Sequence, residues 1–227
     1  LFLQLNADKF TSLHRLRAEG FHVERRLRLA HLADASPRLR ELQDGHARFG
    51  FGPRSCSALM GNEVKEGAIF ADFKCTFTTR TRPANTILYG HNMASGKSFA
   101  KLTRYCTWNT SKITGTRLGI SQYIASPTVE FDTVWEKGTY KVFAAIFVNT
   151  EEKNGEVFKY YKQRTIANEG EFYDYIGKIM DRSQFYTDVD LQYGDELLTL
   201  STCYYPLGSY IDTRYVVFAR RVREGES

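Results

Sequence analysis

The chain has 227 residues, of which 42% are hydrophobic and 25% are charged, a composition typical of a globular protein with a sizeable core. No run of about 18 apolar residues and no signal-peptide pattern is present, so the sequence predicts no membrane-spanning helix. The net charge is +5, but residues 1–60 alone hold ten Lys and Arg against six Asp and Glu. The rest is nearly neutral, which argues against a nucleic-acid-binding groove in the main part of the chain.

The composition changes sharply near residue 60. Every Tyr, Ile and Trp lies after this point, whereas four of the five His lie before it. We therefore divide the chain into an atypical basic segment, residues 1–60, and a main domain, residues 61–227. Leucines in the first segment could form short amphipathic helices, so we expect it to be helical or irregular. A weak membrane-surface helix and a segment translated out of frame are alternatives that the sequence leaves open. Because the first residue is Leu1, we also expect the chain to be a fragment.

From residue 61 onward, short β-type runs alternate with turns. A short helix is predicted within residues 95–106, and residues 169–182 place four apolar side chains on one helical face. Many short strands must protect their edges, so we predict a mainly β fold, a closed or nearly closed barrel with helices inserted between its strands. The predicted strands cover residues 68–73, 86–91, 129–133, 139–148, 157–161, 197–203 and 214–222.

The four cysteines show no spacing that is typical of a metal site. Cys56, Cys75, Cys106 and Cys203 form no C-x-x-C pair, which argues against zinc or thioredoxin-like chemistry. Their even number permits disulfides, but free cysteines are the simpler interpretation. No ligand cluster accompanies His91, so we predict neither a metal nor another cofactor.

Three residues at predicted strand ends stand out. His91 ends the run TILYGH, Cys203 ends the run ELLTLSTC, and Arg214 begins the run RYVVFARR. Each has an ordinary explanation by itself: a structural histidine, a buried inert cysteine and a salt-bridged arginine. Strand ends form a rigid platform above which loops can shape a groove, so the three can also act together.

The chemistry of amide cleavage by a cysteine requires these three residue types. A free thiol is mostly protonated at neutral pH, and a neighbouring imidazolium favours the reactive thiolate. The same imidazolium can later protonate the leaving amine. Attack on the amide builds negative charge on its oxygen, which a permanently charged guanidinium can stabilise. We therefore predict a catalytic set of His91, Cys203 and Arg214.

These motifs resemble those of sortases, the cysteine transpeptidases of Gram-positive cell surfaces. Residues 199–203 match T-L-x-T-C, the arginine of the family falls on Arg214, and Y-G-H-N-M followed by a helix resembles class B in particular. The resemblance covers about residues 61–224. It implies a β-barrel of about eight strands and cleavage of a sorting signal after its Thr, through a thioester on Cys203. In class B this signal resembles N-P-x-T followed by N or G.

The resemblance also implies partners and a place of action. The substrates would be surface proteins with C-terminal sorting signals, and the acceptor would be an amine of a peptidoglycan cross-bridge or a pilin. Such an enzyme acts on the extracytoplasmic face of the cell membrane, held by an anchor that would lie outside this chain. By position, the residues expected to bind substrate are Asn92, Tyr175, Ile176, Ser201 and Thr202. Tyr175 and Ile176 could equally be plain core, and Asn92 could orient His91 or cap the next helix.

The missing first-strand motifs and the basic N-terminal segment keep alternatives open. The first-strand motifs of class B sortases are missing from residues 1–60, so an inactive barrel that binds peptides or partners is the second interpretation. Other cysteine acyl-transfer enzymes fit less well. L,D-transpeptidases place their arginine close to the cysteine, and papain-like peptidases place the cysteine before the histidine, whereas here His91 comes first. A nucleic-acid-binding protein would depend on the basic N-terminal segment alone.

Overall fold

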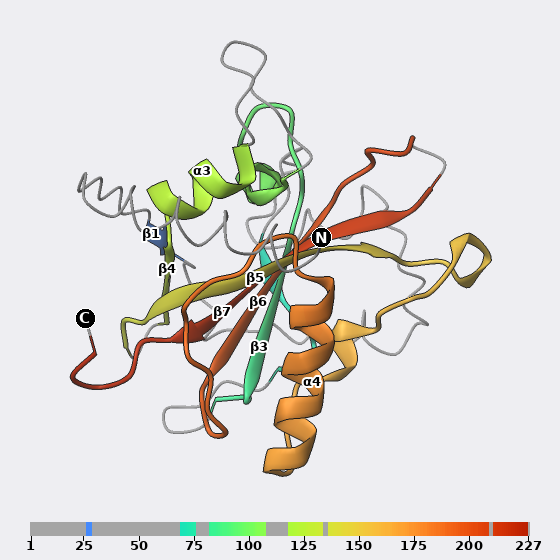
Figure 1. Cartoon of the computed structure of the whole chain (residues 1–227). Coiled ribbons are helices and arrows are strands. Elements are labelled where there is room, and N and C mark those ends of the chain that lie inside the picture. The colour runs from blue at the N-terminus through green and yellow to red at the C-terminus, as the bar shows by residue number, and fades with distance from the viewer. Residues whose placement is uncertain are drawn as a thin grey trace, which may run out of the picture.

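The computed structural model of the chain describes residues 26–28, 69–75, 82–107, 118–133, 136–208 and 211–226. Their strands form a seven-stranded sheet in the order β1-β4-β5-β7-β6-β3-β2 (Figure 1). The strands are β1 Arg26–Arg28, β2 Phe70–Ala71, β3 Asn85–Gly90, β4 Thr128–Asp132, β5 Thr139–Asn149, β6 Leu197–Cys203 and β7 Thr213–Arg221. The helices are η2 Ala100–Tyr105, α3 Leu118–Ala125, η3 Glu152–Asn154, η4 Tyr160–Lys162 and α4 Glu169–Arg182.

The centre of the sheet is buried on both faces. All residues of β3 and β6, and all but the last residue of β7, are buried. A strand covered on both faces needs apolar residues in consecutive positions, which explains the near-continuous runs TILYG, LLTL and YVVFA. The pairing of β3 with β6 is parallel, whereas β7 runs antiparallel to β6 and β5.

Different helices cover the two faces. On one face, η2 and α3 contribute Leu102, Tyr105 and Tyr123 to a cluster with the even-numbered β6 residues Leu198 and Leu200. On the other, which we call the α4 face, the buried side of α4 packs against the residues that alternate with these along each strand. These strand residues are Ile87, Tyr89, Leu197, Val216 and Phe218.

The α4 helix begins and packs as its sequence predicts. The side chain of Asn168 accepts a hydrogen bond from the backbone N–H of Glu171 at 2.9 Å and so caps the helix. The Glu171 carboxylate in turn accepts from the Ala167 N–H at 2.7 Å. Its buried residues, Phe172, Tyr175, Ile176 and Ile179, recur at helical spacing and face the sheet.

Most predicted elements are found within one or two residues of their expected positions. The mainly β fold is confirmed, as are the helices inserted after the His91 strand and before the Cys203 strand. The described residues form seven strands of a curled sheet with β1 and β2 at its edges, so the expected eight strands and closure stay predictions. The short strand β1 lies in the segment that we expected to be helical or irregular. The rest of residues 1–60 lies outside the described part of the chain.

One predicted strand is wrong. Residues 157–161 form no strand, and η4 occupies Tyr160–Lys162 instead. The segment lies over the α4 face, where Tyr160 joins the core cluster. Its neighbour Arg164 accepts through its backbone carbonyl from the Asn85 N–H at 3.1 Å. Tertiary packing therefore overrides the β propensity of this aromatic run.

No helix within the described ranges is long and apolar enough to cross a membrane. The same ranges contain no group of three or more His, Cys, Asp or Glu side chains arranged to hold a metal ion. Cys75, Cys106 and Cys203 are free cysteines, and Cys56 lies outside the described residues.

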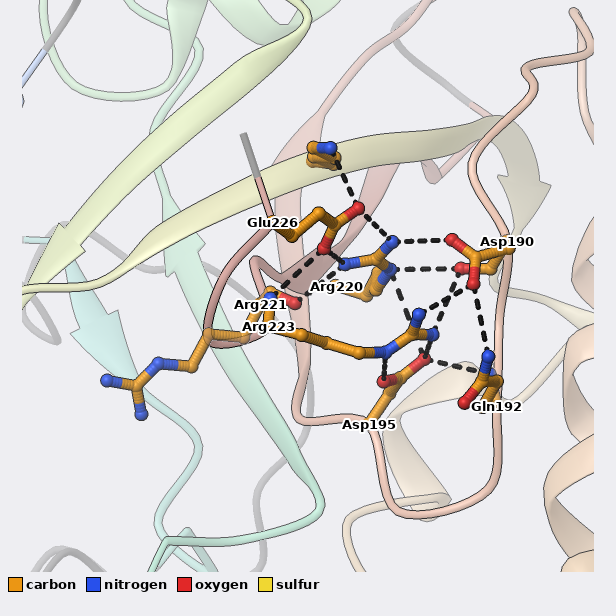
Figure 2. Close-up of polar contacts among 8 residues, drawn as sticks. Asp190, Gln192, Asp195, Arg220, Arg221, Arg223 and Glu226 are labelled. Atoms are coloured by element: carbon orange, nitrogen blue, oxygen red, sulfur yellow. Dashed lines mark hydrogen bonds and ion pairs between the residues drawn. The ribbon is translucent and has the colours of Figure 1, made fainter.

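A cluster of ion pairs closes the end of the sheet where β7 finishes (Figure 2). Arg220 is fully buried, and its guanidinium donates to Asp190 at 2.7 Å and to both carboxylate oxygens of Glu226. Arg223 binds Asp195 through two hydrogen bonds of 2.8 Å each. A buried arginine is tolerated only when its donors are matched by acceptors. We call Lys141, Asp190, Asp195, Arg220, Arg223 and Glu226 the C-terminal cluster.

We expect this cluster to make stability depend on acid pH. Hydrogen bonds from Arg220, Lys141 and the Arg223 N–H lower the pKa of Glu226, and hydrogen bonding from Arg223 lowers that of Asp190. A carboxyl group whose pKa is lower in the folded state stabilises the fold above its unfolded pKa, and this contribution is lost as the pH falls through the folded pKa. Urea unfolding between pH 7 and 3 should therefore give a shallower decline for Glu226→Gln than for wild type below about pH 5.

The matched control is Glu224→Gln, which removes the same charge two residues away and outside the cluster. Its unfolding free energy should decline with pH as the wild type's does. Parallel curves for wild type and Glu226→Gln would contradict the assigned contribution of the cluster.

Candidate active site

Strand register brings the three predicted catalytic residues to one end of the sheet. In the parallel pair β3 and β6, Gly90 lies opposite Thr202, so the next residues along the two strands are His91 and Cys203. In the antiparallel pair β6 and β7, Cys203 lies opposite Arg214. Three strand ends therefore present His91, Cys203 and Arg214 at neighbouring positions, although β3 is far from β6 and β7 in the sequence.

Cys203 and Arg214 lie on the same face of the sheet. Directly opposed residues on paired strands share a face, and alternation along β6 and β7 places this pair with Leu197, Val216 and Phe218 on the α4 face. The cysteine is 7% exposed and the arginine 4%. The thiol and the guanidinium are therefore held close to each other at the edge of the core, where charges interact more strongly than in bulk water.

A tight turn follows β3 and carries His91. The Phe99 N–H donates to the carbonyl of His91 at 2.9 Å, and Asn92 pairs with Ser98 across the turn. A Cβ atom on Gly90 would lie 2.7 Å from the Phe99 ring, so only glycine permits this packing before the histidine. The Thr202 hydroxyl donates to the Gly90 carbonyl at 2.8 Å and fixes the end of β3 to β6.

The guanidinium of Arg214 is bound by its own chain. It donates from Nη2 to Asp212 Oδ2 at 3.2 Å, from Nη1 to Asp212 Oδ1, and from Nη1 to the Thr213 carbonyl at 2.9 Å. Burial opposes its charge, but the hydrogen bond to Asp212 and the neighbouring Cys203 raise the pKa of Arg214 above its usual value. The arginine therefore remains a cation beside the thiol.

Two tyrosines border the same site. The phenol of Tyr160 lies 2.7 Å from the hydroxyl of Ser201, two residues before the cysteine on the same face. Burial raises the pKa of Tyr160 to about 12, although the hydrogen bond with Ser201 and the positive charge of Arg214 both act to lower it. Tyr205, which is 43% exposed, lies beside Cys203, and partial burial together with this neighbour raises its pKa to about 12. Both phenols remain neutral at physiological pH.

The residues expected to bind substrate fall into two groups. Ser201 lies on the Cys203 side of β6, but its hydroxyl is buried and covered by Tyr160. Asn92 is exposed in the turn beside His91, and it is not the cap of η2, whose N-cap is Phe99.

The other three expected substrate contacts have structural roles. The Thr202 side chain faces away from Cys203 and binds the Gly90 carbonyl, so it lies on the opposite face of β6 from the thiol. Tyr175 and Ile176 are core residues of the α4 face. The Tyr175 phenol accepts a hydrogen bond from Asn85, which lies at the far end of β3. Since a strand rises about 3.3 Å per residue, this position is about 20 Å from His91. The core alternative for these two residues therefore fits the structure better.

Sequence reasoning missed Asp212, Tyr160 and Tyr205. Asp212 had a readable signal, because a carboxylate two residues before an arginine shares its face in an extended strand. Tyr205, two residues after the cysteine, had the same kind of signal. Tyr160 had none, because its contact with Ser201 spans 41 residues.

A separate polar pocket of about 400 Å³ lies at the opposite end of β6 and β7, beside the C-terminal cluster. Because the strands separate it from Cys203, it takes no part in the site. Its lining residues are Gly194, Asp195, Glu196, Arg221, Val222, Arg223 and Glu224.

The family assignment follows from comparison with known proteins. The family model described as a sortase domain matches residues 57–222. The chain belongs to the sortase family. It is 28% identical to sortase B of Listeria monocytogenes over 141 residues, which are 62% of the chain and 49% of that protein. The chain spans about half the length of the curated relatives it matches.

Solved sortase structures show the same fold. Sortase B from Listeria monocytogenes has a TM-score of 0.54 and 26% identity, covering 70% of this chain and 75% of that one. A sortase B complexed with triglycine has a TM-score of 0.54 and 25% identity, covering 71% and 65%. The expected resemblance to class B sortases is confirmed, since all these relatives carry that name. The sortase match begins close to residue 60, where the composition changes.

We expect Cys203 to be the most reactive of the described cysteines. Desolvation raises the pKa of Cys75, whose thiol donates to the Asn85 carbonyl at 3.7 Å, and Cys106 is fully buried in the core. Cys203 instead lies opposite a permanently charged guanidinium, and reactive cysteines are typically found in such electropositive surroundings. Brief treatment with iodoacetamide at pH 6 to 7, followed by peptide mass spectrometry, should label Cys203 first.

Arg214→Gln is the control, since losing the guanidinium should slow labelling of Cys203 and leave Cys75 unchanged. Equal labelling rates at Cys75 and Cys203 in the wild type would favour an inert thiol.

Proposed function

We propose that this chain is a cysteine transpeptidase that cleaves a sorting signal after its Thr and transfers the new carboxyl end to an amine. The observation that carries the proposal is the strand register, which aligns His91, Cys203 and Arg214 at one end of β3, β6 and β7. Membership of the sortase family supports the same chemistry.

The proposed reaction proceeds in two balanced steps. The thiolate of Cys203 attacks the Thr carbonyl carbon, the C–N bond breaks, and the imidazolium of His91 gives its proton to the leaving amine. Arg214 donates hydrogen bonds to the carbonyl oxygen as negative charge develops on it. An incoming amine then attacks the thioester, loses a proton to His91, and releases the Cys203 thiolate.

The proposed substrates are surface proteins with an N-P-x-T signal followed by N or G. The proposed acceptor is an amine of a peptidoglycan cross-bridge or a pilin. The solved complex of a similar sortase B with triglycine makes this peptide the first acceptor to test. Since such substrates and acceptors meet outside the cytoplasmic membrane, we also propose its extracytoplasmic face as the place of action.

The test uses quenched fluorescent peptides with N-P-x-T-N, N-P-x-T-G, S-P-x-T-G and L-P-x-T-G, each with and without triglycine. We expect cleavage of an N-P-x-T peptide between Thr and the next residue, an acyl adduct on Cys203 by mass spectrometry, and a triglycine product when the acceptor is present. Cys203→Ala is the control for contaminating proteases.

A lack of both cleavage and acyl adduct with every peptide would contradict the proposal. Fluorescence anisotropy with the same peptides would then show whether the domain binds them without turnover, which is what the inactive-barrel alternative expects.

A further inference from the structure

The carboxylate of Asp212 binds the guanidinium of Arg214 but takes no part in the proposed chemistry. Residues two apart in an extended strand project from the same face, which brings this carboxylate to the guanidinium. Both carboxylate oxygens are engaged: Oδ1 accepts from Nη1, and Oδ2 accepts from Nη2 at 3.2 Å. Two parallel hydrogen bonds of this kind fix the orientation of a guanidinium as well as its position.

The backbone of Asp212 is itself anchored to the sheet. The Asp212 carbonyl accepts from the Thr150 N–H at 3.2 Å and from the Thr150 hydroxyl at 2.7 Å. The next residue, Thr213, pairs with Asn149 of β5 and receives a hydrogen bond from Arg214 Nη1 at 2.9 Å on its carbonyl. The side chain of Arg214 is therefore tied to the end of β5 through Asp212, as well as to its own strand β7.

Orientation matters because a guanidinium is planar and its donors diverge at fixed angles. Once one edge is bound, the direction of every other N–H group is set. A donor that stabilises a developing oxyanion is effective when it is already aimed before the reaction, since no reorganisation is then needed. Cys203, which lies opposite Arg214, supplies the attacking atom beside which that oxyanion would form.

We propose that Asp212 is a positioning residue that holds the Arg214 guanidinium toward the Cys203 end of the site. The inference rests on the proposed function for its effect on turnover. The contact itself, however, is independent of any substrate. The effect on turnover and the contact between Asp212 and Arg214 are therefore measured in separate experiments.

The turnover experiment compares Asp212→Asn and Asp212→Ala with wild type, using as substrate the fluorescent peptide that the wild type cleaves. We expect kcat to fall by about 10-fold to 100-fold, while KM changes by less than about threefold. Because Asp212 acts through Arg214, Asp212→Ala should have little further effect in an Arg214→Lys background. Added formate should partly restore kcat to Asp212→Ala, and chloride at equal ionic strength should not.

Asp190→Asn is the matched control. It also removes a carboxylate bound to arginines, but it lies at the opposite end of the sheet in the C-terminal cluster, so kcat should stay within about twofold of wild type. Thermal unfolding of each variant separates a positioning effect from loss of fold. An unchanged kcat in Asp212→Ala, or an equal loss with and without Arg214, overturns the inference.

The second readout needs no substrate. Nitrogen-15 NMR of the arginine side chains should show separate, slowly exchanging Nη signals for Arg214 in wild type, because hydrogen bonds at both Nη atoms hinder rotation of the guanidinium. These signals should merge in Asp212→Ala and stay separate in Asp190→Asn, with Arg214→Lys providing their assignment. Identical Arg214 signals in wild type and Asp212→Ala overturn the inference even if turnover falls. A wild type that cleaves no peptide counts against the proposed function, and the NMR result still decides whether Asp212 holds Arg214.

Discussion

Cys203→Ala is expected to abolish peptide cleavage, with kcat/KM falling by at least about 1,000-fold, while the fold stays intact. The thiol is the atom that forms the thioester, and nothing else in the proposed mechanism can replace it. The substitution removes one sulfur from a side chain at the edge of the core, so the unfolding free energy should fall by less than about 2 kcal/mol. Cleavage of the fluorescent peptide and thermal unfolding measure the two effects.

Cys106→Ala is the matched control, since it makes the same substitution in the other buried free cysteine of the described residues. It should cost stability and leave cleavage unchanged. Substantial turnover by Cys203→Ala would remove the cysteine from the mechanism altogether.

Arg214→Lys should lower kcat/KM by about 100-fold, roughly 2.7 kcal/mol of transition-state stabilisation. Lysine keeps the positive charge but cannot donate at once to both oxygens of Asp212 and to the Thr213 carbonyl in the planar arrangement that Arg214 uses. Its ammonium group would therefore lack a fixed direction toward the reacting carbonyl. Steady-state kinetics with the fluorescent peptide measure the effect.

Arg221→Lys tests the same substitution at the other end of β7, where Arg221 pairs with Glu136 and Glu196. It should leave kcat/KM within about twofold of wild type. Near-full activity of Arg214→Lys would mean that charge alone is sufficient, and the proposed directional role of the guanidinium would be wrong.

The sequence predicts the elements of the site better than its side-chain contacts. Strand β6 and helix α4 begin and end where the pattern predicts. LLTLSTC is a short run of mostly apolar and β-branched residues, and Phe172, Tyr175, Ile176 and Ile179 recur at helical spacing. Placing His91, Cys203 and Arg214 at strand ends also required only the local pattern. Their alignment depends on which strands pair with each other. The spacing of residues along the chain does not encode this pairing.

The differences have physical causes. The sequence of α3, LGISQYIA, is rich in β-branched and aromatic residues and shows no clear helical stripe, so sequence analysis did not predict a helix there. Residues 157–161 have β propensity but lie over the α4 face instead of joining a ladder, because Tyr160 bonds to Ser201. Tyr175 matches the expected groove by position, yet its phenol contacts Asn85 and lies within the core.

The parallel contact between β3 and β6 also determines when the chain can acquire the proposed activity during folding. Thr202 binds Gly90, which is 112 positions away in the sequence, and the segment between them includes α3, β4, β5 and α4. Bringing together strands so distant in sequence is entropically slow, so this pairing should form late and limit the folding rate. Until it does, the imidazole of His91 and the thiol of Cys203 are not held side by side. In the proposed mechanism, recovery of peptide cleavage during refolding would therefore report completion of the native topology, and it should lag behind recovery of helical circular dichroism.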